Sequence, residues 1–350
     1  LPVLQKRKTQ NGFSMIRWGI IGCGNVCEVK GGPAFAKAQG SALIAVMRRN
    51  GELARDYAER HGVARWYDDA QKLIDDPEVD AVCIATPPGS HREYALRVAD
   101  AGKPCWVEKP MARNFTECAE MVGAFHAKSL PLFVAYYRRR LPRFLKAKEL
   151  IDSGRLGTVT GVTYRQTRFH RAEAGKEWRL QPSESGGGLL LDVGSHTLDI
   201  LDYLLGRFVE YSGSASNFSD NVVEDAVSIQ FRTERGGVGS ASWNFAGSCN
   251  EDLITIDGTR ARLEMSTFGN EPLRVIAKEG VETFDHPNPP HVQQPLIQSA
   301  VDQLLGKGEC PSTGVSAART SRVMDAALSG YYGGREDEFW ARPQTWPRGK

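Results

Sequence analysis

The most informative chemistry lies in a glycine-containing turn at residues 22–27, which reads Gly-Cys-Gly-Asn-Val-Cys. Gly22 would permit a tight turn after a strand, and Gly24 would let the backbone approach a pyrophosphate that faces the free N–H groups of the following helix. Cys27 stands where the usual fingerprint has a third glycine, and it is small enough to pack there. A plain strand-to-helix turn is the alternative, but the position after the first strand of a βαβ unit favours a nucleotide site. The predicted binding residues are Gly22, Gly24, Asn25 and Val26.

The end of the second predicted strand bears on which dinucleotide would bind. An NAD-binding protein commonly places a carboxylate there, against the ribose hydroxyls. This chain has Arg48 and Arg49 at that point instead. Forked guanidinium donors suit a 2′-phosphate, which indicates NADP(H) in preference to NAD(H). The alternatives are a solvated basic turn and one arginine stacked on the adenine ring.

Two further segments end apolar runs at what would be the same sheet edge. Residues 107–110 read Val-Glu-Lys-Pro, and a lysine at the carboxyl end of a parallel strand points into the crevice where ligands bind. Residues 85–91 end the preceding run and could line the nicotinamide ribose. A surface lysine before a turn is the simpler interpretation of Lys109, the candidate catalytic residue. The predicted cofactor contacts are Ala85, Thr86, Pro87, His91 and Glu108.

A third segment, residues 186–199, begins with three glycines and contains Asp192, His196 and Asp199. On a helix, Asp192 and His196 share a face because they are four apart, and Asp199 lies nearly on that face. A carboxylate beside an imidazole can fix its orientation and raise its basicity. A structural Asp–His pair is the alternative. The three glycines favour a ligand site, because they indicate a backbone packed closely against a ligand.

These segments need a scaffold, and the first half of the chain alternates strand and helix patterns. Short apolar runs typical of strands in a parallel sheet occupy residues 16–21, 43–47, 81–85, 105–107 and 132–135. Helical patterns lie between them, with expected N-caps at Ser90 and Asn114. The second half has strand patterns at residues 158–169, 209–218, 226–232, 238–245, 253–257, 261–265 and 273–277. The sequence therefore predicts an α/β protein, with a doubly wound parallel sheet and then a domain whose open sheet is mostly antiparallel.

Composition narrows the class of protein further. The 350 residues suit two domains, and a net charge of +2 gives no electrostatic reason to expect nucleic acid or an anionic membrane as the partner. The seven scattered cysteines indicate reduced thiols in a cytoplasmic protein, and Cys23 and Cys27 lack the further ligands of a zinc site, so no metal is expected. Residues 1–14 have no apolar core for a signal peptide and are expected to be a disordered leader before Met15.

In this order, the glycine turn, Glu108-Lys109-Pro110 and the Gly-Gly-Gly…Asp…Gly…His…Asp string resemble the glucose-fructose oxidoreductase / inositol dehydrogenase (Gfo/Idh/MocA) family. The resemblance implies a Rossmann domain at residues 15–136 and a substrate-binding and oligomerisation domain at residues 137–350. It implies a nicotinamide cofactor and a sugar- or polyol-like substrate. The sequence around Arg48 and Arg49 looks similar to that of NADP-using members of the family. The implied catalytic trio is Lys109, Asp192 and His196. The residues implied to approach nicotinamide or substrate are Tyr137, Arg139, Trp178 and Arg179.

The expected reaction is hydride transfer between nicotinamide C4 and a carbonyl or carbinol carbon. His196 would act as acid or base, Lys109 would polarise the substrate oxygen or assist proton transfer, and Asp192 would hold a substrate hydroxyl or orient the catalytic pair. Lys109 and His196 are expected to share one crevice. Two other functions fit the motifs: a lyase or glycosidase that oxidises its substrate transiently and recycles its cofactor, and a non-catalytic dinucleotide sensor.

The second predicted sheet also indicates how the protein would form oligomers. Alternating residues such as Val227, Ile229 and Phe231 are expected on its open face. An apolar face of that kind needs a partner, so the sequence predicts a homodimer or homotetramer formed through it.

Overall fold

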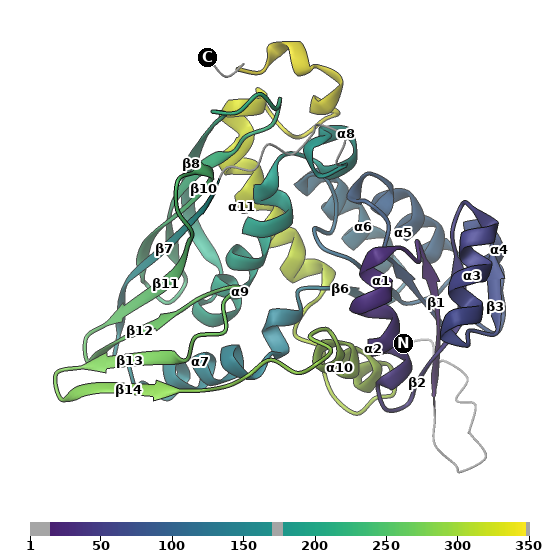
Figure 1. Cartoon of the computed structure of the whole chain (residues 1–350), viewed down its shortest axis with the longest axis horizontal. Helices are drawn as coiled ribbons and strands as arrows, with labels where there is room; N and C mark the ends of the chain where they lie inside the picture. Colours follow the sequence, from purple (N-terminus) through teal and green to yellow (C-terminus); the bar gives the residue numbers. More distant parts are fainter. Residues whose placement is uncertain (1–14, 170–177, 348–350) are drawn as a thin grey trace. The chain divides into compact units, whose positions relative to one another are not determined.

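The computed structural model describes residues 15–169 and 178–347, and Figure 1 labels its helices and strands. The chain divides into two compact units. The first unit comprises Leu1–Ala112, Glu117–Tyr137 and Pro289–Ala318, and the second comprises Arg113–Thr116, Arg138–Asn288 and Arg319–Lys350. The leader expected at residues 1–14 lies outside the described residues. Each unit has a sheet of its own.

The first unit is built on six parallel strands in the order β3-β2-β1-β4-β5-β6. They are β1 (Ile16–Ile21), β2 (Ser41–Met47), β3 (Arg65–Tyr67), β4 (Ala81–Ile84), β5 (Cys105–Val107) and β6 (Leu132–Val134). This confirms the predicted doubly wound parallel sheet. Five of the strands coincide with the apolar runs of the sequence. The edge strand β3 was not predicted, because its three residues are at least partly exposed and form no apolar run.

Helices connect these strands: α1 (Asn25–Val29), α2 (Gly31–Lys37), α3 (Gly51–His61), α4 (Ala70–Asp75), α5 (His91–Asp100) and α6 (Phe115–Ala127). The Asn50 side chain caps α3 by accepting the N–H groups of Glu52 and Leu53 at 3.1 and 3.2 Å. Ser90 stands at the predicted N-cap position of α5, but its side chain makes no capping hydrogen bond. Residues Pro88–Ser90 form a 3₁₀ turn, and the Ser90 hydroxyl lies 2.8 Å from Thr86 Oγ1 instead of capping α5.

The segment Pro289–Ala318 belongs to the first unit, although it follows the second sheet in sequence. It contains α10 (Gln294–Leu304) and the start of α11 (Gly314–Tyr332). The Gln298 side chain binds both backbone groups of Gln39, at 2.7 and 3.1 Å, and the Ser312 hydroxyl donates to Val134 O at 2.7 Å. The single domain boundary expected after residue 136 misses this return, because a linear pattern of elements does not show where the chain comes back.

The second unit is built on eight strands in the order β14-β13-β12-β11-β7-β10-β9-β8, and only the β7–β10 pair is parallel. Its strands are β7 (Val159–Phe169), β8 (Phe208–Ser216), β9 (Ala226–Thr233), β10 (Val238–Gly247), β11 (Glu251–Gly258), β12 (Ala261–Met265), β13 (Leu273–Ala277) and β14 (Gly280–Phe284). The mostly antiparallel sheet is thus confirmed. The edge strand β14 was not predicted, because it is exposed along most of its length.

Helices cover one face of this sheet (Figure 1). The long helices are α7 (Pro142–Asp152), α9 (Ser195–Leu205) and the later part of α11. Short turns of helix lie at Tyr137–Arg140, Trp178–Leu180, Pro182–Ser185 (α8), Phe339–Ala341 and Pro343–Thr345, and a π-helical turn at Leu190–Gly194 leads into α9.

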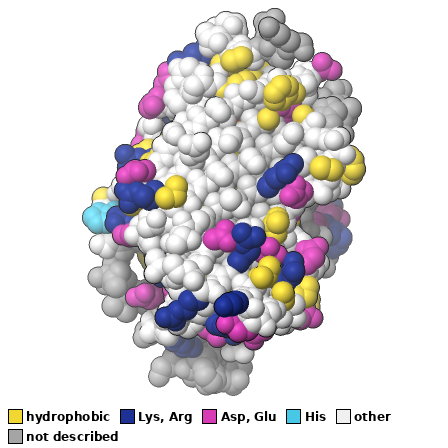
Figure 2. Space-filling view, turned by 90° about the vertical axis from the view of Figure 1, so that its left-hand side faces the viewer, with side chains coloured by type: hydrophobic (Ala, Val, Ile, Leu, Met, Phe, Trp, Pro, Cys, Tyr) yellow, Lys and Arg dark blue, Asp and Glu magenta, His cyan; other side chains and the backbone are white. Residues whose placement is uncertain are grey.

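The open face of the sheet is not where the sequence placed the apolar residues. Val227, Ile229 and Phe231 are between 1 and 4% exposed and belong to the covered face, whereas Ser228 and Gln230 are exposed. Figure 2 shows that side of the protein as a surface with few hydrophobic side chains at its centre. The placement of these three residues on the open face is therefore wrong, since strict alternation cannot tell which face the helices will cover.

Among the described residues, no helix combines the length and the apolar character that crossing a membrane requires.

Candidate functional site

The predicted cofactor residues of the first unit lie together at the carboxyl edge of its parallel sheet. The backbone N–H of Gly22, after β1, donates to Met47 O at 2.9 Å, and that of Ala85, after β4, donates to Ile21 O at 2.8 Å. Glu108 N, after β5, donates to Ile84 O at 2.9 Å. The ends of β1, β2, β4 and β5 are thus adjacent, which confirms that these motifs share one sheet edge.

The two glycines of the turn differ in how closely other atoms approach them. Gly22 has φ = +89°, and a Cβ there would lie 2.7 Å from Thr86 Cγ2, so only glycine fits. A Cβ at Gly24 would meet nothing closer than Gly22 O at 4.0 Å, which leaves the front of the turn open. Asn25 and Val26 begin α1 directly after it. The turn therefore has room for a phosphate group against its backbone.

Arg48 and Arg49 lie just beyond the end of β2, next to this turn. Both are exposed, and the backbone N–H of Arg48 donates to Tyr67 O at 3.1 Å. The arginines directly precede Asn50, which caps α3, so both residues lie between the end of β2 and the start of α3. Two guanidinium groups are therefore available to an anionic ligand at this edge.

Glu108 and Lys109 follow β5, but their surroundings differ. The Glu108 carboxylate is buried and accepts a hydrogen bond from Gln293 Nε2 at 2.8 Å. Burial raises the pKa of Glu108 above its ordinary value. Lys109 is half-buried at the strand end. Gln293 was missed by the sequence analysis, because it lies in the segment that was assigned to the other domain.

His91 does not have the role that the sequence predicted. Its ring is fully buried, with Nε2 2.7 Å from Thr86 O and Nδ1 3.2 Å from both Pro110 O and Met111 O. Burial lowers the pKa of His91, and the three carbonyl groups oppose that shift. Because both ring nitrogens face backbone carbonyl groups, His91 joins the Thr86 loop to the loop after Lys109 and does not present a nitrogen to a cofactor.

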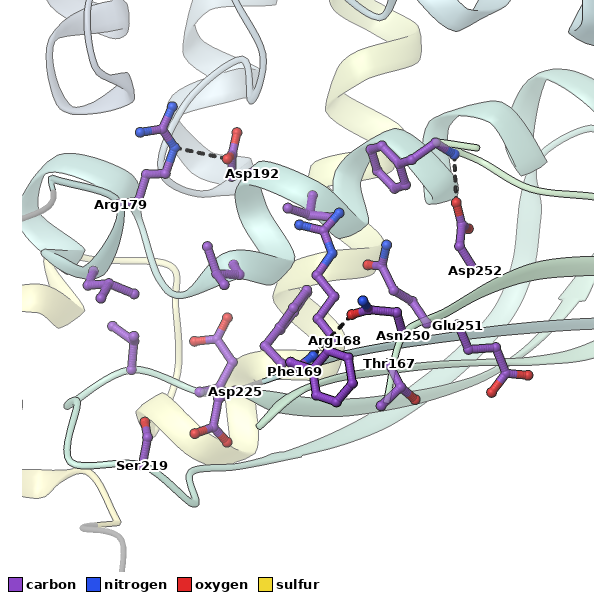
Figure 3. A pocket seen from close by; sticks show the side chains of 18 of the residues that line it. Thr167, Arg168, Phe169, Arg179, Asp192, Ser219, Asp225, Asn250, Glu251 and Asp252 are labelled. Carbon is purple, nitrogen blue, oxygen red and sulfur yellow. Dashed lines mark hydrogen bonds and ion pairs between the residues drawn. The ribbon is translucent and has the colours of Figure 1, made fainter. Parts of the chain in front are cut away.

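The second unit contains a cavity of about 770 Å³ at one end of its sheet. Its wall includes the last residues of β7, the first residues of β11, the loop of residues 219–225 and the segment that carries Asp192. Figure 3 shows that most of the labelled side chains around it are polar or charged. A cavity of this size, lined by both polar and apolar side chains, can hold a small ligand that has several hydroxyl groups.

Asp192 and Arg179 point toward one another across the wall of this cavity (Figure 3). Arg179 Nε donates to Asp192 Oδ2 at 3.0 Å, and the Arg179 guanidinium lies 4.5 Å from the centre of the Trp178 ring. Asp192 sits in the π-helical turn, a distortion that is frequent at functional sites. The structure thus brings together three of the predicted site residues, Asp192, Arg179 and Trp178.

His196 lies one turn further, near the start of α9. It is 5% exposed, and its ring meets the edge of the Phe268 ring at a centroid distance of 5.9 Å. Phe268 lines the cavity, and its backbone N–H donates to Asp252 Oδ2 at 2.6 Å. His196 is therefore a close neighbour of the cavity wall. Phe268 and Asp252 were not found from the sequence, since they lie in a turn and a strand with no recognisable motif.

Arg139 and Asp199 were assigned to substrate and to the imidazole, and both assignments need correction. The two side chains are buried and form a two-pronged ion pair, with Nε–Oδ2 2.8 Å and Nη2–Oδ1 2.7 Å. Asp202 lies 3.6 Å from the same guanidinium. The pair joins the turn before α7 to α9 and has a structural role, because the charge of each group is used by the other. Tyr137 belongs to the first unit and is buried.

Glycine is required at residues 186–188 for a different reason from the predicted one. A Cβ at Gly186 would overlap the Arg113 backbone, and a Cβ at Gly188 would overlap the Glu224 carbonyl oxygen. A Cβ at Gly187 would lie 2.7 Å from Leu191 Cδ2, at a φ of +155°. The interpretation that they admit a ligand is wrong, since these positions pack against the protein's own chain.

Comparison with known proteins fits this geometry. Residues 16–136 match the family model described as "Oxidoreductase family, NAD-binding Rossmann fold", and residues 144–264 match the GFO/IDH/MocA C-terminal domain. Oxidoreductase P35 of Formosa agariphila is 40% identical over 317 residues, which cover 89% of this chain and 98% of that protein. The chain belongs to the Gfo/Idh/MocA family. As a member, it is an NAD(P)-dependent oxidoreductase with an NAD-binding Rossmann domain.

Two other family relatives are similar over almost their whole length. The 1,5-anhydro-D-fructose reductase of Ensifer adhaerens is 28% identical, covering 90% of this chain and 97% of its own. Among solved structures, aldose-aldose oxidoreductase from Caulobacter crescentus, complexed with glycerol, superposes with a TM-score of 0.80 at 25% identity and covers 90% and 98% of the two chains.

Proposed function

We propose that this family member transfers a hydride between NADP(H) and a carbonyl or carbinol carbon of a sugar- or polyol-like substrate. The observation that carries the proposal is the polar cavity of the second unit, whose wall holds Asp192 and Arg179 and whose residue Phe268 contacts His196. The relatives named above, a sugar-derivative reductase and an aldose-aldose oxidoreductase, support the substrate class.

The chain's own residues would divide the work as follows. Asp192 would accept a hydrogen bond from a substrate hydroxyl, and the hydrogen bond from Arg179 Nε orients that carboxylate. His196 would hold or receive the proton of the reacting oxygen, and Lys109 would polarise that oxygen with its ammonium group. NADP, when bound along the open glycine turn, supplies the hydride acceptor. We predict that Lys109 and His196 share one crevice.

The cofactor preference is the finer part of the proposal. A 2′-phosphate carries nearly two negative charges, and exposed arginines at the end of β2 can meet it with charge-assisted hydrogen bonds. Arg48 and Arg49 stand where NAD-specific proteins of this fold commonly have a carboxylate. The next carboxylate, Glu52, already belongs to α3.

The location and assembly of the protein are also part of the proposal. All seven cysteines are free thiols in the structure, which suits the reducing cytoplasm. We expect a homodimer or homotetramer. Because Val227, Ile229 and Phe231 lie on the covered face, a partner on the open face would have to meet polar residues such as Ser228 and Gln230.

A direct assay tests the proposed function. The purified protein would be mixed with NADP⁺ or NAD⁺ and a panel of aldoses, anhydrosugars and inositols, while the absorbance of reduced nicotinamide is followed. We expect turnover with at least one sugar and a higher kcat/KM with NADP⁺. Absence of cofactor reduction across the panel, together with absence of NADPH oxidation by keto-sugars, would contradict the proposal.

A further inference from the structure

We propose that Glu224 and Arg335 are positioning residues that hold the triple-glycine segment at its two ends and thereby fix Asp192 in the cavity wall. Its catalytic consequence rests on the proposed function. Both residues belong to the second unit, and neither was singled out by the sequence analysis.

The Glu224 carboxylate binds Gly188, the last residue of the triple-glycine segment (residues 186–188). Its side chain is 1% exposed, and both carboxylate oxygens accept the Gly188 N–H, at 3.0 and 2.9 Å. The Tyr332 hydroxyl donates to the same carboxylate. Glu224 also lines the cavity, and Asp225 beside it accepts the Phe218 N–H at 2.9 Å, which steadies the loop that presents Glu224.

Arg335 binds Gly186, the first residue of the same segment. Its guanidinium is 1% exposed and donates from Nη1 to Gly186 O and from Nη2 to Arg113 O, each at 2.7 Å. Asp325 on α11 accepts Nε at 2.7 Å and balances the charge. One carbonyl and one N–H of the same three-residue segment are therefore each bound by a buried, charged side chain.

Burial of these two charges needs a reason, because removing an ion from water costs free energy that its partners only partly return. A glycine segment has no side chains with which to anchor itself, and it loses more conformational freedom on ordering than other segments do. Glu224 and Arg335 supply the missing anchors. Charge-assisted hydrogen bonds of this kind are stronger and more directional than neutral ones.

The anchored segment leads straight to the functional residue. The Leu191 N–H donates to Gly188 O at 3.2 Å, and the π-helical turn Leu190–Gly194 follows, with Asp192 at its centre. A displacement of Gly188 would therefore be passed to Asp192 and to its contact with Arg179. A misplacement of about 1 Å can cost roughly 10²-fold in rate, even when its source is remote from the reacting atoms.

Aromatic residues near the C-terminal end of the described chain pack against the partners of Glu224 and against Arg335. The Tyr332 ring, whose hydroxyl binds Glu224, packs against Phe339 and Trp346 at centroid distances of 4.8 and 4.7 Å. The Arg335 guanidinium lies 4.3 Å from the centre of the Phe339 ring. Both anchors are thus held by one aromatic cluster.

The test compares Glu224→Gln, Glu224→Leu and Arg335→Lys with the wild-type chain. Glu224→Gln keeps the shape and one acceptor, Glu224→Leu removes both acceptors, and Arg335→Lys keeps the charge but loses the forked geometry. Glu234→Gln is the matched control, because Glu234 pairs with Arg207 at an exposed surface. Thermal melting establishes that each variant folds.

Hydrogen exchange of the backbone amides is the first readout, because it needs no turnover. We expect faster exchange at residues 188–194 in Glu224→Leu and Arg335→Lys, a smaller change in Glu224→Gln, and none in Glu234→Gln. Unchanged exchange at residues 188–194 in folded Glu224→Leu would overturn the proposal.

Kinetics then separate positioning from a general loss of stability. We expect kcat/KM for the sugar to fall by about 10-fold to 10²-fold in folded Glu224→Leu, with the KM for NADP⁺ unchanged and the deuterium isotope effect on kcat increased. A loss of folded protein alone would lower the rate and leave the isotope effect unchanged. Faster exchange with wild-type kinetics would also overturn the proposal.

The two proposals can fail separately. If the wild-type protein reduces no cofactor with any sugar, the proposed function fails. Sugar binding to the same variants, measured by calorimetry, then replaces the kinetics. Binding that is weakened in Glu224→Leu and not in Glu234→Gln supports the positioning role, and equal binding in all of them contradicts it.

Discussion

Arg139 and Asp199 form an ion pair that is almost completely removed from solvent, with two hydrogen bonds of 2.8 and 2.7 Å. Burial raises the pKa of Asp199 to about 6, and the Arg139 guanidinium opposes that rise. The pair joins the turn before α7 to α9, which carries His196 three residues before Asp199. It therefore contributes to the scaffold of the site and not to substrate contact.

Single and double substitutions of this pair should have opposite consequences. We expect Asp199→Leu or Arg139→Leu to lower the free energy of unfolding by about 3–5 kcal/mol, because each leaves a buried charge without its partner. The double variant should recover much of that loss. Chemical denaturation measures all three, with Glu234→Gln as a surface control. A double variant less stable than either single variant would contradict this description.

Replacement of Lys109 tests the assignment of the lysine at the end of β5. We expect Lys109→Ala to lower kcat by at least about 10²-fold, the usual scale for loss of an acid–base or polarising group. Lys128→Ala is the control, because Lys128 lies on the surface and pairs with Asp100. Steady-state kinetics with the best sugar of the panel decide the matter, and unchanged turnover in Lys109→Ala would remove Lys109 from the mechanism.

Arg48→Asp tests cofactor selection at the end of β2. A carboxylate would repel a 2′-phosphate and accept hydrogen bonds from the ribose hydroxyls, so the ratio of kcat/KM for NADP⁺ to that for NAD⁺ should reverse. Arg55→Asp, an equal change of charge on the exposed face of α3, should leave the ratio unchanged. Equal or better use of NAD⁺ by the wild-type protein would show that the arginines do not select the phosphate.

Glu28 provides a pH-dependent prediction for the helix after the glycine turn. Hydrogen bonds from Arg60 and His61, near the end of α3, hold the pKa of Glu28 at about 2, against the direction of burial. Its stabilising effect is therefore fully present above the ordinary pKa of 4.5 and is lost as the pH falls toward 2. Glu28→Gln should lower Tm at pH 7, and the difference from wild type should shrink below pH 4.5. A difference that stays constant with pH would contradict the charge-assisted contact.

The strands that could be predicted from the sequence are those whose residue pattern is typical of only one kind of structure. Apolar runs such as Cys105–Val107 have no role except burial in a parallel sheet, and the observed strand has those bounds. The exposed edge strands β3 and β14 carry no such pattern. The face occupied by Val227 could not be predicted, because alternation specifies two faces and not which of them the helices cover.

The site was predictable where spacing reflects local structure and not where a partner lies far away in sequence. Asp192 and Arg179 were each predicted as site residues, but their contact with one another was not predicted. Arg139 was misassigned because its partner, Asp199, is 60 residues away. Glu224, 36 residues beyond Gly188, belongs to no motif, so its contact with that glycine becomes visible only in three dimensions.

Transfer of an isotope from the cofactor to the sugar tests the central claim most directly. The protein would be incubated with NADPH that carries deuterium at both hydrogen positions of nicotinamide C4 and with a keto-sugar of the panel, and the product would be analysed by mass spectrometry and NMR. Direct hydride transfer predicts that the deuterium appears on the former carbonyl carbon of the sugar, with one NADP⁺ formed per product molecule. Product that carries no deuterium, or that forms without net oxidation of NADPH, would contradict the account.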